Sequence, residues 1–107
     1  MIFDRLRAKS ADRRQQVKAK QAVEATFDGF VTTHPGTQAW VEQATGFNKA
    51  SLLLVATDGE WLRRSVPTTK WAQDYVADSG LVCHIAGIDP YPQRMRDWDA
   101  AHRPPKD

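Results

Sequence analysis

The side chains of this sequence that are best suited to catalysis are one cysteine, three histidines and a few acidic residues. Cys83 and His84 are adjacent, a nucleophile next to a base. Neighbouring residues on a β-strand point to opposite faces, so adjacency on a strand does not make a catalytic dyad. We therefore expect Cys83 to be a buried structural residue and His84 to be a surface or hydrogen-bonded histidine.

A metal site is not predicted either. The paired short spacings of zinc ligands are absent from the candidates, which are His34, His84, His102 and Cys83. Restriction-endonuclease-like enzymes place an acid on one strand and Glu-x-Lys on the next to hold a metal. Here Glu60 is followed two residues later by Leu62, and Asp58-Gly59 is explained as a hairpin turn.

Glycine-rich phosphate-binding motifs and the nucleophile-elbow motif are also absent from the sequence. We therefore expect no catalytic residue, no metal and no small-molecule cofactor. A small enzyme with an unrecognised site stays open as a further alternative.

Size and composition indicate one globular domain. The chain has 107 residues, of which 41% are hydrophobic and 26% charged, and this is ordinary for a folded domain. The longest apolar run, residues 52–56, is far shorter than the roughly 20 residues of a membrane span. Charged residues follow Phe3 at once, so no secretory signal is predicted, and the single Cys83 excludes an internal disulfide. We expect a cytoplasmic protein, with a peripheral position at a membrane as one option.

Charge divides the chain into a basic arm and a mildly acidic body. Residues 1–24 contain seven cations and three anions, a net +4, whereas the remainder contains eight cations and ten anions, a net −2. Residues 4–24 lack glycine and proline and are rich in helix-forming residues, but their apolar residues are sparse. We predict a helical arm over 1–24, a folded domain over 25–102 and a flexible tail over 103–107.

The domain itself is predicted to be α+β. We expect strands at 27–31, 51–57, 60–66 and 81–86, and helices at 40–47, 68–79 and 93–102. This order matches the ferredoxin-like sandwich. That topology would, however, place the polar strand 60–66 in the middle of the sheet, where the apolar strand 51–57 fits better. We therefore predict a mixed or antiparallel sheet of three to four strands packed by helices, with the strand order left open.

The most distinctive segment is Tyr91-Pro92-Gln93-Arg94-Met95-Arg96-Asp97-Trp98. Together with residues 58–85 it resembles small uncharacterised actinobacterial proteins that carry a similar Tyr-Pro-Gln-Arg-Met-Arg-Asp segment. The resemblance covers about the last half of the body. It implies a bacterial cytoplasmic origin and no particular activity.

These features favour a non-catalytic accessory protein that docks on a larger assembly, with the cytoplasmic side of a membrane complex as one candidate. The alternative is a nucleic-acid-associated protein that binds through the cations of the arm. An anionic membrane surface would also attract the basic arm and its apolar tip. The predicted partner-binding residues are Phe3, Leu6, Arg13, Arg14, Tyr91, Arg94 and Trp98.

Overall fold

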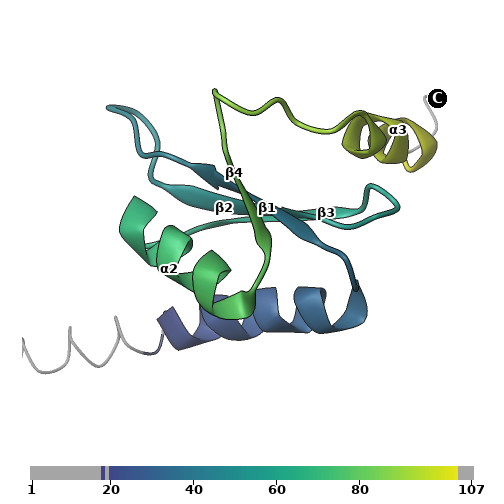
Figure 1. Ribbon diagram of the computed structural model, residues 1–107. Coiled ribbons are helices and arrows are strands. Elements are labelled where there is room, and N and C mark those ends of the chain that lie inside the picture. The colour runs from purple at the N-terminus through teal and green to yellow at the C-terminus, as the bar shows by residue number, and fades with distance from the viewer. Residues whose placement is uncertain (1–17, 19, 104–107) are drawn as a thin grey trace, which may run out of the picture.

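The computed structural model of the protein describes residue 18 and residues 20–103 (Figure 1). Three helices and a four-stranded sheet form an α+β fold, as the sequence predicts. In chain order the elements are a helix over residues 20–33, β1 (Gln38–Glu42), β2 (Ser51–Val55), β3 (Trp61–Ser65), α2 (Thr69–Ser79), β4 (Val82–Ile85) and α3 (Gln93–Ala101).

The sheet is mixed, with the strand order β3-β2-β1-β4. β1 pairs with β2, and β2 with β3, in antiparallel fashion, whereas β1 and β4 are parallel. The two apolar strands therefore lie in the centre, and the polar β3, which carries Arg63 and Arg64, lies at an edge. The ferredoxin-like order is not observed, because the first element of the domain is a helix, over residues 20–33, and the second is a strand, β1.

Two predicted elements are wrong. Residues 27–31 are helical, since Val23, Phe27, Phe30 and Val31 recur at helical spacing and turn one face to the sheet. Residues 38–42 form a strand instead of the expected helix over 40–47. β1 lies in the centre of the sheet and is covered on both faces, so its side chains are apolar without strict alternation and could be mistaken for a helical pattern.

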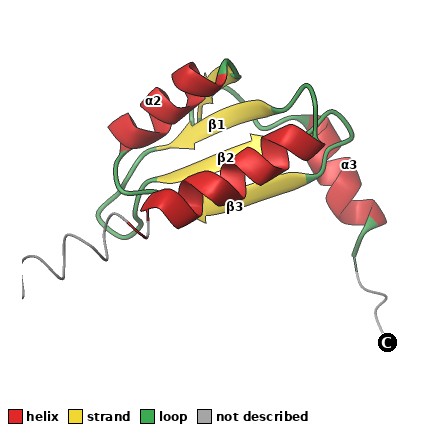
Figure 2. Ribbon diagram, turned by 90° about the horizontal axis from the view of Figure 1, so that it is seen from below, coloured by secondary structure: helices red, strands yellow, loops and turns green. Residues whose placement is uncertain are grey.

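The first face of the sheet is covered by the helix of residues 20–33 and by α2 (Figure 2). Phe27, Leu52 and Leu54 are completely buried between these layers. α2 begins as predicted, because the Thr68 side chain accepts a hydrogen bond from the backbone N–H of Trp71. It ends at Gly80, whose φ of 69° few other residues adopt readily.

The second face is covered at one end by α3 (Figure 1). Trp40, Leu53, Val55 and Met95 form this smaller core, and Tyr91 packs against it. The hairpin between β2 and β3 meets α3 at Gly59, which has a φ of 97°. A Cβ atom at Gly59 would lie 2.0 Å from the backbone oxygen of Arg94, so only glycine permits this approach.

Candidate functional site

Glu42 is the centre of a polar network at the end of the sheet opposite the β2–β3 hairpin. Its Oε1 accepts hydrogen bonds from Ser51 Oγ and Arg63 Nε, each 2.7 Å away, and its Oε2 accepts one from the Tyr91 hydroxyl. The strand register explains the arrangement, because Glu42 pairs with Ser51 and Ser51 pairs with Ser65 on the third strand. The same face of three strands thus carries a carboxylate and two hydroxyls side by side.

The network keeps this carboxylate ionised. Burial raises the pKa of Glu42, but the hydrogen bonds from Tyr91, Ser51 and Arg63 outweigh burial, so the pKa is lower than usual. For Arg63, burial lowers the pKa, but the bond to Glu42 more than compensates. The negative charge is therefore held by internal donors.

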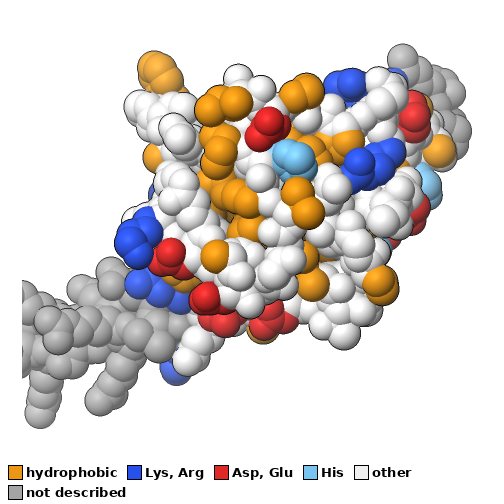
Figure 3. Space-filling view, in the orientation of Figure 1, with side chains coloured by type: hydrophobic (Ala, Val, Ile, Leu, Met, Phe, Trp, Pro, Cys, Tyr) orange, Lys and Arg blue, Asp and Glu red, His pale blue; other side chains and the backbone are white. Residues whose placement is uncertain are grey.

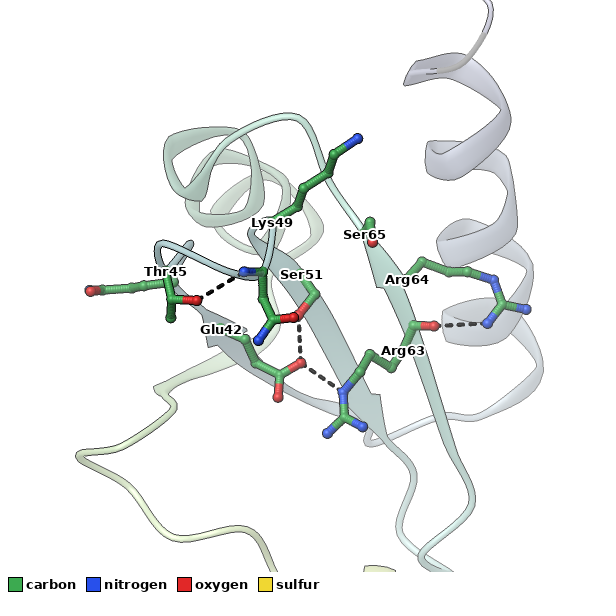
Figure 4. Close-up of a pocket in the computed structure, with 9 residues that line it drawn as sticks. Glu42, Thr45, Lys49, Ser51, Arg63, Arg64 and Ser65 are labelled. Carbon is green, nitrogen blue, oxygen red and sulfur yellow. Dashed lines mark hydrogen bonds and ion pairs between the residues drawn. The ribbon is translucent and has the colours of Figure 1, made fainter.

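A pocket of about 490 Å³ opens beside this network (Figure 4). Its walls are Glu42, Gln43, Thr45, Asn48, Lys49, Ser51, Arg63, Arg64 and Ser65. Figure 4 shows Arg63 turned towards Glu42, whereas Lys49 and Arg64 point away from it. Among the residues that the structure describes, neither Lys49 nor Arg64 forms a salt bridge. We call this the basic pocket, because its walls carry three cations and one carboxylate, and that carboxylate is paired with Arg63.

One rim of the basic pocket is the loop between β1 and β2. Thr45 organises its turn: the Thr45 N–H donates to the Asn48 carbonyl, and the Thr45 hydroxyl accepts from the backbone N–H groups of Phe47 and Asn48. Phe47 lies within this turn and is 99% exposed. An ordered turn thus presents an aromatic side chain entirely to solvent.

A second surface feature surrounds the edge strand β4. Cys83 is exposed, so the expectation of a buried cysteine is wrong: β4 is an outer strand, and no element covers Cys83. Val82 and Ile88 are 55% and 79% exposed. In the space-filling view, hydrophobic side chains gather over β4 and the segment that follows it (Figure 3). We call Val82, Cys83 and Ile88 the β4 patch.

The outer edge of β4 is capped by its own chain. Ala86 N donates inwards to Val41 O, so the polar groups of Ile85 point outwards. The Ile85 N–H donates to Asp89 Oδ2 at 3.0 Å, and the Ile85 carbonyl accepts from the N–H groups of Ile88 and Asp89. This turn blocks the addition of a strand at Ile85, the C-terminal end of β4.

The three histidines take part in separate local contacts. His34 Nε2 and Glu60 Oε2 are 2.6 Å apart, His84 stacks on Trp40, and His102 Nδ1 lies 2.8 Å from the Trp98 carbonyl oxygen. Over residues 18 and 20–103, no group of three His, Cys, Asp or Glu side chains is arranged to hold a metal.

Three predicted partner-binding residues lie at the C-terminal end of the domain and make internal contacts. Tyr91 donates to Glu42, Arg94 Nε donates to the Ala56 carbonyl oxygen, and Trp98 stacks on His102. The structure therefore brings Tyr91, but neither Arg94 nor Trp98, to the edge of the basic pocket. The other four, Phe3, Leu6, Arg13 and Arg14, lie outside the described residues.

Sequence reasoning missed the Glu42 network and the basic pocket. Trp40 and Glu42 share one face of β1 and Val41 takes the other, but the sequence indicates this only once residues 38–42 are assigned to a strand. Once residues 40–47 are assigned to a helix, this alternation goes unnoticed, and Glu42 cannot be placed opposite Ser51.

Comparison of the chain with protein-family models, with curated proteins and with solved structures gives no match. Within the part of the chain that the structure describes, no helix is both long enough and apolar enough to cross a membrane.

Proposed function

We propose that this protein is a non-catalytic accessory protein that docks on a larger protein assembly through the β4 patch. The observation that carries this proposal is the exposure of Val82 and Cys83 on an edge strand and of Ile88 in the turn that follows it, in a segment without charged residues. From residue 81 to residue 88 the chain contains no Lys, Arg, Asp or Glu. Exposed apolar groups that lie together are typical of protein–protein contact surfaces.

The capped edge of β4 limits how a partner can bind. Partners of edge strands commonly add a strand of their own through backbone hydrogen bonds. Here Ile85 already uses its N–H and carbonyl with Asp89 and Ile88. The partner surface is therefore apolar and contacts the side chains of the patch. Docking of this kind resists salt, because it depends little on charge.

The test compares a patch variant with a variant at Phe47, the exposed aromatic residue of the β1–β2 loop. Full-length wild type, Val82→Asp with Ile88→Asp, and Phe47→Asp are each used to capture partners from the native cell. The partner is then identified, purified and rebound to each chain at low and high salt. We expect binding to fall at least about tenfold in the patch variant, because two buried carboxylates oppose association. Phe47→Asp should bind like wild type.

Other outcomes contradict the proposal. Loss of the partner with Phe47→Asp would move the docking site to the β1–β2 loop. Self-association of the purified chain that disappears with the patch variant, measured by analytical ultracentrifugation, would make a second copy the occupant. Equal binding by all three chains would exclude the patch.

A further inference from the structure

The end of the domain that carries the basic pocket combines positive charge with an exposed aromatic residue. Lys49, Arg63 and Arg64 line the pocket together with three hydroxyl-bearing residues. Arg63 is already paired with Glu42, whereas Lys49 and Arg64 point away from that carboxylate and can meet an anion from solution. Lysine, arginine and hydroxyl groups are the usual protein donors to phosphate oxygens.

The helix of residues 20–33 begins at this same end. Figures 1 and 2 both show its first turn on the side of the molecule where the β1–β2 loop lies. Lys18 and Lys20 are exposed there. Acidic residues of the neighbourhood, Glu24, Asp74 and Asp78, line a separate groove with Trp71 and Tyr75 on the helical side of the sheet. The pocket and the acidic groove therefore face different directions.

Phe47 stands out from this basic end. Its ring is 99% exposed, and the turn that carries it is fixed by the Thr45 hydrogen bonds. A rigidly presented aromatic ring pays little ordering entropy when it enters an apolar environment.

We propose that this end of the domain binds the surface of a membrane that contains anionic lipids. Phe47 enters the boundary between headgroups and acyl chains, and the basic pocket holds a lipid phosphate. Lys18 and Lys20 add long-range attraction to the negative surface. Peripheral membrane binding of this kind combines a small apolar insertion with attraction to anionic lipids. The site lies at a different place from the β4 patch, so either proposal can fail alone.

A membrane fits this surface better than a single-stranded nucleic acid. Nucleic-acid grooves align several aromatic side chains along a basic track, so that successive bases stack. The basic pocket has no aromatic residue in its walls, and Phe47 stands at the loop tip. A single exposed aromatic side chain next to exposed cations matches a membrane surface, where anionic headgroups lie over an apolar interior.

The experiment is vesicle sedimentation of the full chain, in which all variants and vesicles are compared at the same ionic strength, once at low salt and once at high salt. One set of vesicles is phosphatidylcholine alone, and the other contains about one fifth phosphatidylserine. We expect wild type to sediment with the anionic vesicles only. Lys49→Glu with Arg64→Glu should lower the partition coefficient at least about tenfold, because each cation near an anionic surface is worth roughly a fivefold change. Phe47→Ala should lower it by about fivefold or more at every salt concentration.

Matched controls sit elsewhere on the domain. Ile88→Ala removes a second exposed apolar side chain, and Arg96→Glu with Arg103→Glu reverses two cations near the C-terminal end. Both should bind the anionic vesicles like wild type. Circular dichroism and thermal unfolding of each variant verify that the fold is intact. We expect every variant to keep its fold, because all of the substituted side chains are exposed.

Several results would overturn the proposal. Unchanged sedimentation of the loop variants would assign any membrane binding to the residues before position 18. Equal loss in Arg96→Glu with Arg103→Glu would show a non-specific charge effect, and equal loss in Ile88→Ala would show that any exposed apolar side chain contributes. Binding of a single-stranded oligonucleotide, but of neither vesicle, would make the site a nucleic-acid site. Binding of inorganic phosphate without vesicle binding would make the basic pocket a binding site for a soluble anion.

Discussion

The hydroxyl of Tyr91 donates a hydrogen bond to the carboxylate of Glu42, which lies 49 residues earlier in the chain. This contact fastens the segment before α3 to the end of β1. A hydrogen bond to a charged acceptor contributes about 1.5–3 kcal/mol. We expect Tyr91→Phe to lower the free energy of unfolding by about this amount, measured by urea denaturation. In a Glu42→Gln background the same change should have a much smaller effect, and full additivity of the two substitutions would exclude the coupling.

The ionisation of Glu42 should make stability sensitive to acid. Its hydrogen bonds lower its pKa in the folded state below the ordinary value of 4.5. The contribution is therefore present above 4.5 and is lost as the pH falls through the folded-state pKa. Urea midpoints at neutral pH and at about pH 3 measure the loss. Glu42→Gln should lose less stability than wild type over this interval; an equal loss would assign the acid sensitivity to other carboxylates.

His34 should show the opposite dependence. Its pKa is raised above the ordinary 6.5, first by the hydrogen bond to Glu60 and then by the Phe30 carbonyl. The stabilisation is therefore complete below 6.5 and is lost as the pH rises through the folded-state pKa. We expect an NMR titration of His34 to give a raised midpoint in wild type and a lower one in Glu60→Gln. Identical midpoints in the two proteins would show that the ion pair is not formed in solution.

Gly59 should tolerate no side chain. A Cβ atom there meets the Arg94 backbone at 2.0 Å, and the φ of 97° is unfavourable for other residues. We expect Gly59→Ala to lower the free energy of unfolding by about 3 kcal/mol or more, since both strain and steric overlap oppose it. Gly46→Ala is the matched control, because nothing lies within 4 Å of its Cβ position. Comparable stability of the two variants, by thermal and urea unfolding, would show that α3 does not pack on the hairpin.

The basic arm should be dispensable for folding. Residues 1–24 are poor in apolar side chains, so their deletion should lower the free energy of unfolding by less than about 2 kcal/mol. Phe27, only three residues beyond the cut, is completely buried, and Phe27→Ala should lower it by about 3–5 kcal/mol. A truncated chain that fails to fold, judged by circular dichroism, would show that Val23 and the first turn of the helix over residues 20–33 are essential to the core.

Features that depend only on neighbouring residues, such as helix ends and tight turns, were predicted correctly from the sequence. Thr68 and Gly80 bound α2 as predicted, because a hydroxyl at the start and a glycine at the end satisfy helix termini independently of the rest of the fold. Asp58-Gly59 lies in the turn between β2 and β3, and the apolar run 51–55 is a central strand. These assignments were sufficient to predict the α+β class.

Elements whose pattern depends on tertiary context could not be assigned in this way. β1 is covered on both faces, so its apolar residues do not alternate with polar ones, and its true period is hidden. Phe27 and Phe30 have aromatic side chains that favour strands, yet packing against the sheet makes their segment a helix. The basic pocket could not be predicted from the sequence for the same reason. It forms only when the sheet brings Glu42, Ser51 and Ser65 into register on three strands.

The cap on β4 also bears on how the protein is made. Asp89 closes the outer edge of a strand that ends four residues earlier, so the closing group leaves the ribosome shortly after the strand does. Until then, Val82 and Ile85 belong to an open, uncharged β-edge, the kind of segment from which ordered aggregates grow. A chain that terminates just before Asp89 would keep this edge permanently open.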